Sequence, residues 1–168
     1  MSILRIGLAA ALPVAPAGTR LTIVFIAGVT DFLDGQIARR CGATSAIGGL
    51  LDAIADKLFT LSAVLTLAVA HNIEPWQSAV ALTRDAAVLL AFGVALTRGR
   101  ASVFVGLAPL RVGKWATAAF FLWFVVEFSP APEWAGWAAF APAGVLSLCA
   151  GASYARALVG ALRRDRAE

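Results

Sequence analysis

Charged side chains are scarce in this sequence. They make up 14% of its 168 residues, whereas 60% of the residues are hydrophobic and the mean hydropathy is +0.82. One domain of this length is too small to hide so much apolar surface in a soluble core. The composition therefore excludes an ordinary soluble protein and predicts an integral membrane protein that forms a single domain over residues 1–168.

Cysteine is also rare, with only Cys41 and Cys149. The distance between them in the sequence fits neither a disulfide framework nor a metal site. We therefore expect both to be small buried or loop residues.

Proline, glycine and clusters of charge interrupt the apolar sequence. A spanning helix needs about 20 mainly apolar residues. The interruptions leave six candidates, near residues 3–15, 20–40, 45–71, 75–97, 108–128 and 134–160. The sequence thus predicts an all-α membrane protein with six transmembrane helices and short loops.

Basic residues are nearly absent from one end of this predicted bundle. That end receives only Arg20, and Lys57 and Arg84 fall inside helices. The termini and the loops near 40–45 and 98–111 share the other end, which carries Arg5, Arg39, Arg40, Arg98, Arg100, Arg111, Lys114, Arg156, Arg163, Arg164 and Arg166. The positive-inside rule places the basic end and both termini on the cytoplasmic side of the cell membrane.

The opposite end carries Trp76, Trp134 and Trp137, which fit an outer aromatic belt. Anionic lipid headgroups on the cytoplasmic side account for the net charge of +4, so no nucleic acid partner is expected.

The N-terminus has a second interpretation. Arg5, the apolar run after it and Ala15-Pro16-Ala17 are similar to a secretory signal with its cleavage site. Removing this helix would invert the charge balance of the remaining five, so we expect it to be retained.

Four aspartates interrupt the second and third predicted helices: Asp31, Asp34, Asp52 and Asp56. A charge at bilayer depth costs roughly 2.5–3.5 kcal/mol on insertion scales, so the four need partners. Residues three or four apart share a helix face. Counted from the turn near Ala43, the carboxylates form two facing levels on the order of 13 to 20 Å from the turn. We call these four residues the acidic box and expect it to open toward the cytoplasm.

Hard oxygen ligands of this kind suit Mg²⁺ or Mn²⁺, and two such ions could clamp the attacking and leaving oxygens of a phosphoryl displacement. Gly35 and Gly48 would let a ligand approach, and Arg39 could neutralise a diphosphate. Helix packing by small residues is the alternative explanation of the glycines. Structural pairing of the carboxylates with Lys57, Arg39 and Arg40 is the other alternative, but three cations balance four buried anions poorly.

The segments Asp31-Phe32-Leu33-Asp34-Gly35-Gln36-Ile37-Ala38-Arg39 and Gly48-Gly49-Leu50-Leu51-Asp52-Ala53-Ile54-Ala55-Asp56 match every position of a known signature, with its spacing. In them the sequence resembles the CDP-alcohol phosphatidyltransferases. The resemblance implies a six-helix membrane enzyme, often a homodimer. It would transfer a phosphatidyl group from CDP-diacylglycerol to an alcohol and release CMP.

The resemblance also implies roles for the matched positions. Asp31, Asp34, Asp52 and Asp56 would bind two divalent ions, and Asp56 would also be the catalytic base. Gly35, Ala38, Arg39 and Gly48 would surround the cytidine diphosphate. Members of the family commonly carry Asn and Thr before an Arg in the first helix, whereas only Ser2 precedes Arg5 as a polar residue here.

The acceptor alcohol is suggested by a second set of residues. The stretches Leu82-Thr83-Arg84-Asp85 and Val112-Gly113-Lys114-Trp115-Ala116-Thr117 are similar to those of phosphatidylglycerophosphate synthases and CMP-forming cardiolipin synthases. Arg84, Arg111 and Lys114 would then bind a phosphate-bearing acceptor, glycerol 3-phosphate or phosphatidylglycerol. Asp85 slightly favours the cardiolipin type. Snorkelling at the inner interface is the alternative explanation of Arg111 and Lys114.

Two other classes of function are weighed against this one. A membrane prenyltransferase also binds a metal diphosphate through aspartates, but its two acidic motifs usually lie far apart. A cation transporter could use the carboxylates as ion sites. Transporters often contain internal repeats, and the acidic segment has no second copy in this sequence.

Overall fold

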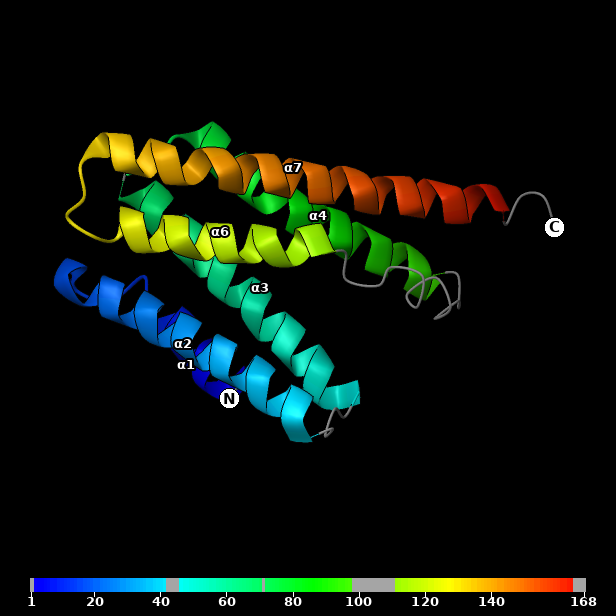
Figure 1. Ribbon diagram of the computed structural model, residues 1–168, viewed down its shortest axis with the longest axis horizontal. Helices are drawn as coiled ribbons and strands as arrows, with labels where there is room; N and C mark the ends of the chain where they lie inside the picture. Colours follow the sequence, from blue (N-terminus) through cyan, green and yellow to red (C-terminus); the bar gives the residue numbers. More distant parts are fainter. Residues whose placement is uncertain (1, 42–45, 71, 98–110, 165–168) are drawn as a thin grey trace. The chain divides into compact units, whose positions relative to one another are not determined.

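The computed structural model describes residues 2–41, 46–70, 72–97 and 111–164 (Figure 1). These residues form six helices and contain no strand, which confirms the all-α prediction. The helices are α1 (Ser2–Ala11), α2 (Ala17–Cys41), α3 (Ala46–Val69), α4 (Pro75–Thr97), α6 (Arg111–Glu127) and α7 (Glu133–Arg164). Each falls on one of the six segments expected from the sequence.

Prolines account for several of the helix boundaries. Pro75 is the first residue of α4, a position where its missing N–H costs nothing. Pro130 and Pro132 lie between α6 and α7 and prevent one continuous helix. The helix expected over 3–15 ends at Ala11, two residues before Pro13. At 1.5 Å rise per residue, α1 is about 15 Å long, half the thickness of a bilayer core.

One described helix segment, Glu133–Ser153, is long and apolar enough to cross a membrane, with a hydropathy of 1.4. A shorter apolar stretch covers Trp115–Glu127. Six spans and two cytoplasmic termini therefore stay predictions.

The chain divides into two compact units. Unit 1 comprises Met1–Pro75 with Phe124–Pro132, and unit 2 comprises Trp76–Trp123 with Glu133–Glu168. Unit 1 thus contains α1, α2 and α3, whereas unit 2 contains α4, α7 and most of α6.

In unit 1, α1 packs chiefly against α3 and also contacts α2. Its buried face carries Arg5, Ala9 and Leu12, spaced four and three residues apart. The hydroxyl of Ser62 on α3 donates a hydrogen bond of 2.6 Å to the Ala9 carbonyl oxygen. Figure 1 shows α1 and α3 running in the same direction, with α2 running the opposite way.

The outward side of α3 is apolar rather than polar. Its exposed side chains include Leu51, Ile54, Leu58, Leu61 and Leu65, which recur at alternating spacings of three and four residues. A helix stripe of this kind is unfavourable in water and suits contact with lipid or another apolar surface.

Aromatic side chains form the core of unit 2. Trp123 is fully buried, and its ring centroid lies 5.0 Å from that of Phe140 and 5.8 Å from that of Phe120. Trp76 stacks on Trp137 at 5.8 Å. The Trp76–Trp137 stack joins the start of α4 to the start of α7, and the Trp123–Phe140 contact joins α6 to α7.

Small residues bring α4 and α7 close along the same interface. A Cβ atom on Gly144 would lie 3.4 Å from the Val80 side chain and 3.5 Å from the Phe140 ring. The Ser147 hydroxyl donates a hydrogen bond of 3.2 Å to the Val80 carbonyl oxygen. The two helix backbones can therefore approach more closely than large side chains would allow.

Candidate active site

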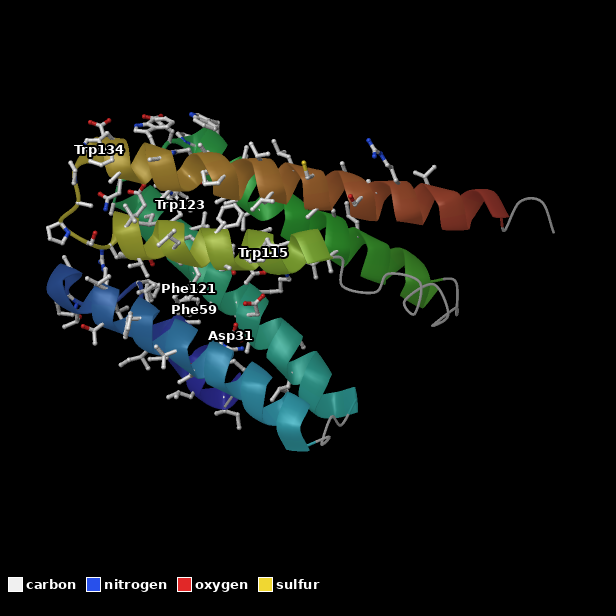
Figure 2. All side chains as sticks on the ribbon, in the orientation of Figure 1. Asp31, Phe59, Trp115, Phe121, Trp123 and Trp134 are labelled. Atoms are coloured by element: carbon white, nitrogen blue, oxygen red, sulfur yellow. The ribbon has the colours of Figure 1, made fainter. Side chains whose placement is uncertain are left out.

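Two members of the acidic box have described side chains. Asp31 lies on α2 and Asp56 on α3, and both are half-buried (Figure 2, where Asp31 is labelled). Asp34 and Asp52 occupy the same two helices, but their side chains lie outside the described residues. The structure thus brings the predicted acidic positions onto two successive helices of unit 1.

An ion pair joins Asp31 to the first helix. The Arg5 Nη2 atom lies 2.7 Å from Asp31 Oδ1. The Arg5 side chain is only 3% exposed, whereas that of Asp31 is 46% exposed. The two opposite charges therefore form a close ion pair, in which a buried guanidinium faces a partly exposed carboxylate.

The burial of Arg5 was not predicted from the sequence. The charge pattern assigned Arg5 to the basic end of the bundle, and the structure buries it on the face of α1 that also carries Ala9 and Leu12. The signal that could have revealed this is its spacing from Ala9 and Leu12, which places an arginine on an otherwise apolar helix face.

The packing of α1 on α3 also relates Asp31 to Asp56 in depth. Ala9 is level with Ser62 because the Ser62 hydroxyl binds its carbonyl oxygen. Four residues earlier on each helix, Arg5 is level with Leu58. Leu58 is two residues from Asp56, about 3 Å of helical rise. The register therefore places Asp56 close in depth to the backbone of Arg5, and the level formed by Asp31 and Asp56 stays a prediction.

The described part of the chain contains no group of three or more His, Cys, Asp or Glu residues that could hold a metal ion. The side chains of Asp34 and Asp52, half of the acidic box, lie outside the described residues. The donor chemistry of Asp31 and Asp56 nevertheless fits hard cations, because carboxylate oxygens are the ligands that Mg²⁺ and Mn²⁺ prefer.

The other predicted site residues are located only by their helices. Gly35, Ala38 and Arg39 belong to α2, and Gly48 belongs to the first turn of α3. The side chains of this set lie outside the described residues. Their contacts with cytidine diphosphate stay a prediction.

The expected acceptor residues belong to unit 2. Arg84 lies on α4, and Arg111 and Lys114 begin α6, but their side chains also lie outside the described residues. The neighbouring Asp85 is described and is 7% exposed, an unusual position for a carboxylate on an apolar helix.

Residues 2–149 match the family model described as CDP-alcohol phosphatidyltransferase. The chain belongs to this family. The match includes all four aspartates of the acidic box together with α1, α4 and α6. The resemblance noted in the two acidic segments therefore extends over most of the chain.

Curated relatives carry two names within this family. A Streptomyces coelicolor protein named cardiolipin synthase (CMP-forming) is 37% identical over 82 residues, which are 49% of this chain and 38% of that protein. A Blochmanniella floridana protein named CDP-diacylglycerol–glycerol-3-phosphate 3-phosphatidyltransferase is 50% identical over 54 residues, 32% of this chain and 27% of its own length.

A longer match is found in Arabidopsis thaliana, with the chloroplastic and mitochondrial CDP-diacylglycerol–glycerol-3-phosphate 3-phosphatidyltransferase 1. It is 28% identical over 176 residues, 90% of this chain and 58% of that protein. The chain thus spans less than two thirds of the length of each of these relatives.

Proposed function

We propose that this protein transfers a phosphatidyl group from CDP-diacylglycerol to an alcohol and releases CMP. The observation that carries the proposal is the complete acidic signature, which lies inside the family match and on the successive helices α2 and α3. The family match favours this reaction over the prenyltransferase and transporter alternatives.

The chemistry requires a base for the acceptor hydroxyl. An alcohol is a poor nucleophile near neutral pH, so a carboxylate must take its proton as the new bond forms. Asp56 is assigned this role. The acceptor oxygen forms a bond to the phosphorus of the phosphatidyl group, the bond between that phosphorus and the CMP oxygen breaks, and CMP leaves with the electron pair.

The remaining residues bind and orient the donor. Asp31, Asp34 and Asp52, with Asp56, would hold two Mg²⁺ or Mn²⁺ ions, which would offset the charge of the diphosphate and of the departing CMP. Arg39 would add a fixed positive charge beside the diphosphate. Gly35, Ala38 and Gly48 present little or no side chain where the nucleotide approaches.

We assign the acceptor to the phosphate-bearing class, with glycerol 3-phosphate and phosphatidylglycerol as the two candidates. The names of the Blochmanniella floridana and Streptomyces coelicolor relatives support one candidate each. Arg84, Arg111 and Lys114 would bind the acceptor phosphate. A multi-pass homodimer in the cell membrane, with the acidic box open to the cytoplasm, completes the proposal.

The test is CMP release by the purified full chain in lipid micelles. CDP-diacylglycerol is supplied with Mg²⁺ or Mn²⁺, and glycerol 3-phosphate and phosphatidylglycerol are offered in separate reactions. Release with only the first acceptor identifies phosphatidylglycerophosphate synthesis, and release with only the second identifies cardiolipin synthesis. If neither acceptor, nor serine or inositol phosphate, supports release, the proposed reaction is wrong.

A further inference from the structure

Arg5 is a cation held in the interior of unit 1. Its side chain is 3% exposed and its Nη2 atom lies 2.7 Å from Asp31 Oδ1. Burying a guanidinium group is costly unless an anion compensates it. Arg5 therefore has a specific partner within the acidic box, although it lies 26 residues before that partner and outside the family signature.

The exposures of the two partners differ. Arg5 is enclosed, whereas 46% of the Asp31 side chain stays exposed. A carboxylate has two oxygens with about four lone-pair sites, so it can pair with an arginine and still bind a cation. The ion pair thus restricts the orientation of the Asp31 carboxylate without covering it.

The backbone of Arg5 is itself well fixed. Ala9 and Leu12 on the same face of α1 are buried, and the Ala9 carbonyl accepts the hydrogen bond from Ser62 on α3. The position of Arg5 is therefore set by the packing of α1 on α3, the helix that carries Asp56. Through the ion pair, this packing also affects the position of the Asp31 carboxylate on α2. The Arg5–Asp31 ion pair joins α1 to α2, and the Ser62–Ala9 hydrogen bond joins α1 to α3.

We propose that Arg5 is a positioning residue of the metal site, which holds the Asp31 carboxylate in the orientation that binds a divalent cation. The proposal rests on the proposed function, because the metal site belongs to it. It assigns a role to the first helix, and it does so without requiring Arg5 to touch the substrate. Partners that orient metal ligands are typically worth 10- to 100-fold in metal affinity.

The test measures Mn²⁺ binding to the purified full chain by electron paramagnetic resonance, without any substrate. Arg5→Lys keeps the charge but loses the planar fork, and we expect it to weaken Mn²⁺ binding by about 10- to 100-fold. Arg5→Gln, which keeps a donor without the charge, should weaken it as well. The matched control is Arg20→Lys, because Arg20 is half-exposed and donates to the Ala15 carbonyl oxygen. We expect no change in that variant.

A double-mutant cycle separates positioning from a general loss of structure. In an Asp31→Asn background, Arg5→Lys should cause no further loss of Mn²⁺ affinity. An equal loss in both backgrounds would show that Arg5 acts on the fold rather than through Asp31. Unchanged or tighter Mn²⁺ binding in Arg5→Lys would also overturn the proposal, the latter by showing that Arg5 competes with the metal.

The proposed function is read out separately, as CMP release by the unsubstituted chain. A chain that binds Mn²⁺ in an Arg5-dependent way but releases no CMP keeps this inference and refutes the reaction. A chain that releases CMP while its Mn²⁺ affinity is insensitive to Arg5 keeps the proposed reaction and refutes this inference.

Discussion

Asp56 illustrates what single residues contribute to this protein. It is half-buried on α3, close in register to the Arg5–Asp31 ion pair. A carboxylate there would be near both a metal ion and an incoming hydroxyl, which is the position that a catalytic base needs. Arg5 acts on the same site from a different helix, through orientation rather than chemistry.

At this scale we expect Asp56→Asn to abolish turnover while only weakening metal binding. The amide has nearly the same shape but cannot accept the hydroxyl proton, a loss typically worth 10²- to 10⁴-fold in rate. CMP release and Mn²⁺ affinity are measured on the same preparation. Glu133→Gln, the same change at an exposed position that begins α7, is the control and should be fully active. Normal activity of Asp56→Asn would remove Asp56 from the mechanism.

Among the elements, the pair α4 and α7 shows how small residues define an interface. Gly144 lies where an added Cβ would already be in van der Waals contact with Val80 and Phe140, and the Ser147 hydroxyl donates a hydrogen bond to the Val80 carbonyl oxygen. By contrast, a Cβ on Gly93 of α4 would meet no atom within 4 Å. Both glycines lie inside a helix, but they differ in what surrounds them.

We therefore expect Gly144→Leu to destabilise the protein and Gly93→Leu to have little effect. The leucine at 144 must push α4 away from α7 or adopt a strained rotamer, at a cost of about 1–3 kcal/mol. Thermal unfolding in detergent, followed by circular dichroism, measures the difference. Equal unfolding temperatures for the two variants would contradict the close α4–α7 contact.

The whole molecule is predicted to have both termini in the cytoplasm. This orientation depends on the concentration of arginine near the two ends and near two loops, whereas the residues between α6 and α7 contain no basic side chain. The structure contains one helix segment that is long and apolar enough to span a membrane among its described residues. Orientation is therefore the property of the molecule that most needs a direct experiment.

Single cysteines in a chain without Cys41 and Cys149 provide that experiment. We expect Ala131→Cys, between α6 and α7, to react with a membrane-impermeant maleimide in intact cells. Ser2→Cys and Ala155→Cys should react only after the membrane is permeabilised, because the basic end of the bundle faces the cytoplasm. Labelling of Ser2→Cys in intact cells would reverse the orientation, and Ala131→Cys serves as its internal control.

The positions of the helices and the identity of the family were determined by the sequence alone. Apolar runs separated by prolines and charges define helices through local interactions, and six of the expected segments contain a described helix. The acidic signature is also local, since all its residues lie on two neighbouring helices. Its spacing identified the family that the match over residues 2–149 confirms.

Contacts between helices were decided only by the tertiary structure. The charge pattern assigned Arg5 to the basic end of the bundle but did not reveal its burial, because a sequence does not state which face of a short helix becomes buried. Packing of α1 on α3 turned that face inward, and the cost of burying the arginine is offset by Asp31, far away in the sequence. The Ser62–Ala9 and Ser147–Val80 hydrogen bonds likewise join residues on different helices, so no local pattern predicts them.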